Sequence, residues 1–278
     1  MMPRKWIAGW VLALCAASAA LAQAAPSITA AEIIAKNAAA RGGAEAWSKI
    51  QTMAWAGHVE SANAPGRDMP FMLEQMRPNR TRFELMAEGK KSVRVYDGSG
   101  GWKQRPNGTT GVPETLPYSD DELKFAHGAQ VIDGPLMDYV AKGAAVSFGG
   151  YAMAENRRAY IVDVKLPSGG NHRVWVDAET FLEVRHERQV REIGGQLGTV
   201  SVVFRDYHDF EGLQIPTTIE TGPAPGGAQN KLVIERVALN PQLDERMFVM
   251  PVQLSARRRG VTVDTRGAAA AAPRPAPQ

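Results

Sequence analysis

Polar and apolar residues alternate through residues 172–216, a pattern that predicts three consecutive antiparallel β-strands. Val174 and Val176 stand between charged or aromatic residues, and the alternation resumes after the turn-forming residues 177–180. A Gly-Gly pair then leads into another alternating stretch at residues 199–207. Because every second side chain of a strand points to the same face, this meander has one apolar and one polar face. Such a sheet is stable in water only when other elements cover its apolar face.

The same two-residue period recurs on both sides of this meander, and we count about ten or eleven strands in total. The strands outside the meander are expected at residues 53–59, 71–76, 80–86, 92–96, 146–153, 159–166 and 231–239. Two shorter stretches, one that starts at Trp102 and one around Ile219, show a weaker pattern. The chain is therefore mainly β, with two groups of strands separated by a region of different period.

Two short helices are expected before the first strand. Thr29 and Glu32 have the spacing of a capping box, in which each side chain accepts a hydrogen bond from the backbone amide of the other residue. A helix should follow over residues 30–41, where Gly42-Gly43 ends it, and a second helix should cover residues 44–50.

The period changes again between the two groups of strands. Ser119 and Glu122 repeat the capping-box spacing and predict a second pair of helices. Gly134-Pro135 is expected to start the other helix of this pair, which ends at Gly143. We interpret these two amphipathic helices as a partly removable cover over the apolar face of the sheet.

The N-terminal residues are typical of a secretory signal peptide. Arg4 and Lys5 precede an apolar run over residues 6–21, which is short for a membrane span. Two overlapping small-x-small cleavage sites end at Ala22 and Ala24, and either could be cut. We therefore expect a periplasmic protein that is exported through a cleavable signal peptide and has no transmembrane segment in its mature chain.

Removal of residues 1–24 would leave one domain at residues 25–255. Cys15 is the only cysteine and lies in the removed segment, so the mature protein should have no disulfide framework. A lipid on Cys15 is the less favoured alternative, because Leu14 stands where a bacterial lipobox has a small residue.

The positive charge is concentrated at the C-terminal end, although the whole chain has a formal charge of only +3. Five basic residues follow Val252: Arg257, Arg258, Arg259, Arg266 and Arg274. The body of the chain is slightly acidic, whereas a nucleic-acid-binding domain would have a basic body. Residues 256–278 lack any apolar period and are predicted to be a disordered tail rich in Arg, Ala and Pro.

The sequence shows no convincing catalytic or metal-binding pattern. Residues 186–190 (H-E-R-Q-V) lack the second histidine of the zinc motif H-E-x-x-H and lie in a predicted strand. Residues 97–101 (D-G-S-G-G) are better explained as a tight turn than as a serine nucleophile loop, because only His58 lies upstream. The remaining histidines are isolated along the sequence. We expect no enzyme activity, no metal and no cofactor.

Methionine is abundant, and apart from Met1 and Met2 every methionine lies in or beside a predicted strand or helix. A flexible thioether suits surfaces that accommodate variable apolar ligands. A methionine-rich core would explain the same residues.

Three weak motifs occur in an order that resembles the LolA-like periplasmic lipoprotein carriers. They are residues 74–83 (E-Q-M-R-P-N-R-T-R-F), residues 93–98 followed by Trp102, and residues 239–241 (L-N-P) followed by Phe248 and Pro251. The resemblance covers nearly all of residues 28–251. It implies a LolA/LolB-like α+β fold, an incomplete antiparallel β-barrel of about ten or eleven strands wrapped around short lid helices. It also implies a hydrophobic cavity that takes the acyl chains of a lipidated protein or a similar apolar ligand.

The resemblance further implies a binding site. Arg77 matches the family's arginine that holds the lid closed, and its guanidinium is expected to donate to backbone carbonyls within residues 119–142. The candidate ligand-binding residues are Arg77, Trp55, Phe71, Phe83, Leu85, Val95, Trp102, Leu123, Leu136, Met137, Tyr139 and Val140.

A second function stays open at this point. Residues 207–216 (Y-x-x-x-x-G-x-x-I-P) are more typical of the broader outer-membrane lipoprotein-sorting relatives than of the dedicated carrier. The alternative is an envelope regulatory or sensor module of the same fold, although such stress sensors have an additional C-terminal domain for which the tail is too short. Either function implies partner proteins in the inner or outer membrane.

Overall fold

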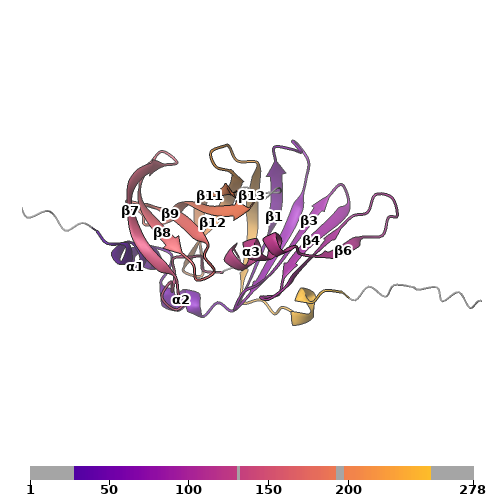
Figure 1. The fold of residues 1–278 in the computed structure, drawn as a ribbon, viewed down its shortest axis with the longest axis horizontal. Helices are drawn as coiled ribbons and strands as arrows, with labels where there is room; N and C mark the ends of the chain where they lie inside the picture. The colour runs from indigo at the N-terminus through magenta and orange to yellow at the C-terminus, as the bar shows by residue number, and fades with distance from the viewer. Residues whose placement is uncertain (1–27, 130–131, 192–196, 252–278) are drawn as a thin grey trace, which may run out of the picture.

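The computed structural model describes residues 28–129, 132–191 and 197–251. Within these ranges, thirteen strands form one antiparallel sheet in the order β6-β5-β4-β3-β2-β1-β13-β12-β11-β10-β9-β8-β7 (Figure 1). The strands are β1 (Thr52–Ser61), β2 (Pro70–Met76), β3 (Arg80–Ala87), β4 (Lys90–Tyr96), β5 (Gly101–Arg105), β6 (Glu114–Pro117), β7 (Ala145–Ala154), β8 (Arg157–Lys165), β9 (Asn171–Asp177), β10 (Glu183–Arg191), β11 (Leu197–Phe210), β12 (Leu213–Pro223) and β13 (Asn230–Leu239).

The sheet is open, because β6 and β7 stand at its two edges and do not pair with each other. This confirms the expectation of a mainly β, incompletely closed architecture, and the central meander is confirmed as β9, β10 and β11. The expected count of ten or eleven strands was too low. The four-residue strand β6 has little apolar alternation, so the sequence pattern did not reveal it.

Three helices accompany the sheet within the described ranges: α1 (Ala30–Ala40), α2 (Ala44–Ser48) and α3 (Asp120–Ala129). Both predicted capping boxes are present. Thr29 N donates to Glu32 Oε2 at 2.8 Å, and Ser119 N donates to Glu122 Oε2 at 3.0 Å. No helix in the part of the chain that the structure describes is long and apolar enough to span a bilayer.

We call the face of the sheet that carries these helices the inner face. The apolar side of α1 packs on Val162, Val164 and Val174 of β8 and β9. Helix α3 contacts one strand in each half of the sheet. Lys103 of β5 donates to Glu122 of α3 at 2.6 Å, and the guanidinium of Arg188 in β10 lies 4.0 Å from the centre of the Phe125 ring of α3. Figure 1 accordingly shows α3 between the half of the sheet that contains β3 and β4 and the half that contains β8 and β9.

Residues 134–143 do not form the predicted helix and are instead a series of turns. Gly134, Asp138 and Gly143 have φ values of 78°, 51° and 67°, in the left-handed region that interrupts a right-handed helix. Lys142 Nζ also donates hydrogen bonds to the backbone carbonyls of Gly134 and Met137, at 2.8 and 2.5 Å. A lysine side chain therefore satisfies carbonyls that backbone amides would satisfy in a helix. We call residues 132–143 the latch loop.

The C-terminal part of the described chain covers the opposite, outer face. A 3₁₀-helix, η1 (Glu245–Phe248), follows β13. Its Phe248 is 1% exposed and packs on Val93, Val95 and Trp102 of β4 and β5. The Trp102 indole Nε1 donates to the Phe248 carbonyl at 3.1 Å. The outer face of β4 and β5 is thus an apolar surface that Phe248 covers.

Candidate functional site

The inner face carries a patch of apolar side chains that are only half-buried. We call it the inner apolar patch, and its members are Trp55, Leu73, Phe83, Leu85, Val202, Phe204, Leu232 and Val237. They surround fully buried residues such as Phe71, whose ring stacks on Phe83 with a centroid distance of 5.7 Å. The patch includes three aromatic side chains, and part of its surface remains exposed to solvent.

Strand register assigns this patch to the inner face. Trp55 of β1 lies opposite Leu73 of β2, and Leu73 lies opposite Phe83 of β3. The row continues through β4 to Lys103 of β5, which binds the Glu122 carboxylate of α3. Directly paired residues share a face, so the patch and α3 lie on the same side of the sheet.

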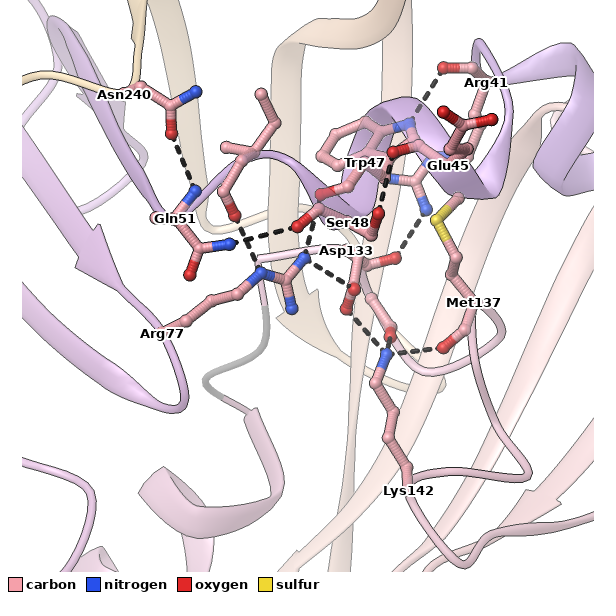
Figure 2. Close-up of polar contacts among 12 residues, drawn as sticks. Arg41, Glu45, Trp47, Ser48, Gln51, Arg77, Asp133, Met137, Lys142 and Asn240 are labelled. Carbon is pink, nitrogen blue, oxygen red and sulfur yellow. Dashed lines mark hydrogen bonds and ion pairs between the residues drawn. The ribbon is translucent and has the colours of Figure 1, made fainter.

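A buried carboxylate fixes the latch loop beside this patch. Asp133 is 1% exposed, and it accepts from Lys142 Nζ at 2.6 Å and from Arg77 Nη2 at 2.8 Å (Figure 2). Its backbone carbonyl accepts from Arg41 Nη1 at 2.7 Å. Three cationic side chains from α1's C-terminal end, the β2–β3 turn and the loop itself therefore converge on one residue.

Arg77 links the latch loop to α2. Its Nε donates to the Ile50 carbonyl at 2.7 Å, and its Nη2 donates to the Trp47 carbonyl at 3.2 Å as well as to Asp133. The sequence-based expectation was that Arg77 bonds to backbone carbonyls within residues 119–142. The structure shows a contact in that region with a carboxylate instead, while the carbonyls belong to the end of α2.

Three largely apolar side chains anchor the latch loop in the core. Leu136 is fully buried with α1 and the β8–β9 valines, and Tyr139 packs against the same cluster. Met137 is 1% exposed and belongs to a second cluster, formed with Trp47 of α2 and Met53 of β1. Trp55 and Val237, which belong to the inner apolar patch, also pack against this second cluster. Displacing Met137 would therefore extend the patch.

Burial and charge oppose each other in the latch. Burial alone would raise the pKa of Asp133, but the Lys142 ammonium and the Arg77 guanidinium outweigh it and hold that pKa below its ordinary value. Burial raises the pKa of the nearby Glu183, whose carboxylate lies 3.4 Å from Arg41 Nη1. The latch is therefore a desolvated charge cluster in which the loss of one partner leaves another uncompensated.

The structure does not bring all the predicted ligand-binding residues together. Trp55, Phe71, Phe83 and Leu85 share the inner face beside the latch, which holds Arg77, Leu136, Met137 and Tyr139. Val95 and Trp102 instead lie on the outer face under Phe248, which separates them from the inner apolar patch. Val140 is 73% exposed at the tip of the latch loop. Leu123 lines a groove beside α3.

Several residues of the site were not predicted from the sequence. Asp133, Lys142 and Arg41 complete the latch, and their only signal was an acidic residue immediately before Gly134-Pro135. His172 and His186 were considered isolated, yet their strands place His172 Nδ1 2.7 Å from His186 Nε2. Within the described ranges, no group of three or more potential metal ligands exists.

The histidine pair predicts a specific pH dependence of stability. Burial and then the Arg188 charge lower the pKa of His172 to about 4. Burial, then the neighbouring His172 and Arg188, hold the pKa of His186 well below its ordinary value. As pH falls below 6.5, these histidines gain protons in the unfolded chain before they do so in the folded protein, so stability falls. For His172 alone this costs roughly 2 kcal/mol between pH 7 and pH 5.

Urea unfolding of wild type and of a His172→Gln/His186→Gln variant at pH 7 and pH 5 measures this contribution. We expect the double variant to lose less stability than wild type between the two pH values. The exposed His208 provides the matched control, because His208→Gln should keep the wild-type loss. An equal loss in the double variant and in wild type would contradict the assignment.

Comparison with known proteins adds a likeness of fold. No family model matches the sequence, and no curated protein matches it. The structure is similar to that of a LolA superfamily protein from Nitrosomonas europaea, with a TM-score of 0.51 and 13% identity, over 80% of this chain and 98% of that chain. It is also similar to an outer membrane lipoprotein-sorting protein domain from Vibrio parahaemolyticus, with a TM-score of 0.49 and 11% identity, over 78% and 94% of the two chains. The chain therefore has a fold similar to that of the LolA superfamily protein from Nitrosomonas europaea.

Proposed function

We propose that this protein is a periplasmic carrier that binds the acyl chains of lipoproteins or similar lipids on its inner apolar patch. The observation that carries the proposal is the patch itself: aromatic and aliphatic side chains from five strands are half-buried on the face that also carries the helices. Contiguous apolar surface of this kind marks ligand-binding or interaction sites in soluble proteins. The fold likeness supports the same interpretation.

The latch loop gives the carrier a way to open and close. Met137 occupies apolar surface that is continuous with the patch through Trp55. An acyl chain and this loop would compete for that surface, and the balance is set by the difference in their binding free energies. Release of the Asp133 ion pairs would free the loop.

The proposal also includes export of the protein to the periplasm and membrane proteins that deliver the ligand to it or receive the ligand from it. The signal-peptide pattern at residues 1–24 supports a periplasmic location for the carrier, and its donor and acceptor would be proteins of the inner and outer membranes. Intact-mass measurement of the exported protein tests the first point. A chain that begins near Ala25 is expected, and a diacylated Cys15 would instead indicate a membrane-anchored acceptor.

A charge placed in the patch should abolish ligand binding. Phe83→Asp is expected to weaken the affinity for a fluorescent acyl probe by at least about tenfold, because a bound chain would desolvate an unpaired carboxylate. Phe83→Ala, which removes only apolar area, should weaken it less. The measurement is a fluorescence titration, with a thermal melt to show that each variant is folded.

Met86 offers a matched control. It lies on the same strand as Phe83, three residues further along, and is 38% exposed. Odd and even positions of a strand alternate between faces, so Met86→Asp places the same charge on the outer face. Wild-type affinity is expected for Met86→Asp. Equal loss in both aspartate variants, or in neither, would argue against binding on the inner face.

A further inference from the structure

Arg188 of β10 is a partly buried cation without a carboxylate partner among the residues that the structure describes. Its buried Nε–H group has no hydrogen-bond acceptor there. Other partly buried arginines, such as Arg77, Arg82 and Arg185, each face a carboxylate. Burial lowers the pKa of Arg188 to about 10, so the guanidinium stays charged at neutral pH. A buried, unpaired cation is costly to keep, which suggests a function.

The guanidinium stands at a groove between α3 and the sheet. The groove has a volume of about 540 Å³ and is lined by Phe125 of α3, by residues 168–171 of the β8–β9 turn, and by His172 and Arg188. The Phe125 ring packs on the guanidinium at 4.0 Å, an arrangement that holds the cation in place while leaving its N–H groups free to donate.

The charges at the rim of the groove do not neutralise this cation. Asp121 lies there, but it is half exposed and faces Lys124, whose Nζ is 3.8 Å from its carboxylate. His127 also lines the groove and contacts the Tyr96 hydroxyl at 2.9 Å. The interior wall is therefore left with Arg188 and with His172, the member of the neutral histidine pair that lines the groove.

The histidine pair can add a second donor. A neutral imidazole carries one N–H, so the short bond between His172 Nδ1 and His186 Nε2 uses the proton of one ring. When His186 donates, His172 carries its own proton on Nε2, the atom that faces Gly170 at the groove. An anion in the groove would favour this tautomer and would receive hydrogen bonds from both His172 and Arg188.

The groove adjoins the inner apolar patch. His186 and Arg188 lie opposite Val202 and Val200 of β11, and Val202 belongs to the patch. From Phe204 of β11, a row of cross-strand neighbours continues through Ile219 and Leu232 to Val59 of β1. Three strand spacings give this row a length of about 14 Å. A charged head at Arg188 would therefore place an attached chain on this row.

We propose that the ligand is an anionic amphiphile, whose carboxylate or phosphate binds Arg188 and His172 in this groove while its chain lies on the inner apolar patch. The proposal rests on the carrier function and makes it more specific, because a neutral acylated ligand would leave the groove unused. Charge-assisted hydrogen bonds in a desolvated site are strong enough to select such a head group.

Two fluorescent probes with the same chain test the proposal: a long-chain fatty acid and its methyl ester. Wild type should bind the acid about tenfold more tightly than the ester, the effect expected from one buried charge-assisted interaction. Arg188→Leu should remove this preference and leave the ester affinity unchanged. Arg173→Leu is the charge-matched control, because Arg173 is half exposed and paired with Asp163, and it should keep the preference.

Each outcome decides a separate point. Equal binding of acid and ester by wild type, or an unchanged preference in Arg188→Leu, would overturn the head-group site while leaving the carrier function standing. Binding of neither probe would overturn both. Excess inorganic phosphate should displace the acid only weakly, because a free anion gains nothing from the patch; complete displacement would indicate a free-anion site instead. A thermal melt and the Arg188→Gln variant distinguish loss of the cation from loss of the fold.

Discussion

Asp133→Asn is expected to lower the free energy of unfolding by roughly 3 to 5 kcal/mol, because it leaves two desolvated cations without their counter-charge. Lys142 Nζ and Arg77 Nη2 both donate to the Asp133 carboxylate, and Asp133 is 1% exposed. Asparagine keeps the size of the side chain, so the loss reports charge rather than packing. Urea denaturation at neutral pH measures it.

Asp138 is the matched control for this substitution. It lies in the same latch loop and is exposed to solvent. Asp138→Asn should change stability by less than about 0.5 kcal/mol, as is usual at surface positions. A similar, small effect of both substitutions would show that the latch is not a tightly coupled cluster.

Arg77→Leu is expected to tighten binding of a fluorescent acyl probe by about tenfold, since it removes charge-assisted bonds worth roughly 1.5 to 3 kcal/mol from the closed latch. The closed loop and the ligand compete for the surface around Met137, so a weaker latch favours the ligand. Arg77→Lys should restore only part of the wild-type behaviour, because one ammonium cannot reproduce a planar fork that reaches Ile50, Trp47 and Asp133.

Arg82→Leu separates this effect from a general loss of arginine. Arg82 follows closely on the same hairpin, but it binds Glu74 and Glu84. We expect Arg82→Leu to leave probe affinity unchanged. If both leucine variants bind the probe like wild type, Arg77 does not control the latch.

The sequence predicted the strands well because their alternation is strong and local. The meander of β9 to β11 and the capping boxes at Thr29 and Ser119 depend on neighbouring residues alone, and the structure confirms them. The missed strand β6 shows the limit of this signal. It has four residues, and its pairing with β5 determines it more than its own pattern does.

Alternation also does not reveal which face a ligand can reach. Val95 and Phe83 are both apolar strand residues, yet Val95 faces Phe248 on the outer side and Phe83 faces inward. That difference arises from a C-terminal segment about 150 residues away in sequence, which covers one end of the outer face. Long-range contacts of this kind leave no local pattern.

The latch shows the same limit for polar residues. The Gly134-Pro135 pattern predicted a helix. Instead, Lys142 donates to two backbone carbonyls of the segment, and Asp133 forms ion pairs with Lys142 and Arg77. These interactions stabilise a series of turns. Likewise, His172 and His186 meet only because β9 and β10 pair in one register. Arg77 was identified because the resemblance supplied a role for it, whereas its actual partner came from the structure.

Photo-crosslinking with an acyl chain that carries a diazirine tests the central claim most directly. After illumination, tandem mass spectrometry locates the modified residues. Our account predicts modification at Trp55, Phe83 and Phe204 of the inner apolar patch, with an excess of unlabelled fatty acid abolishing it. Modification concentrated on outer-face residues such as Met86, or spread evenly over both faces, would contradict the proposal that this sheet carries its ligand on the inner face.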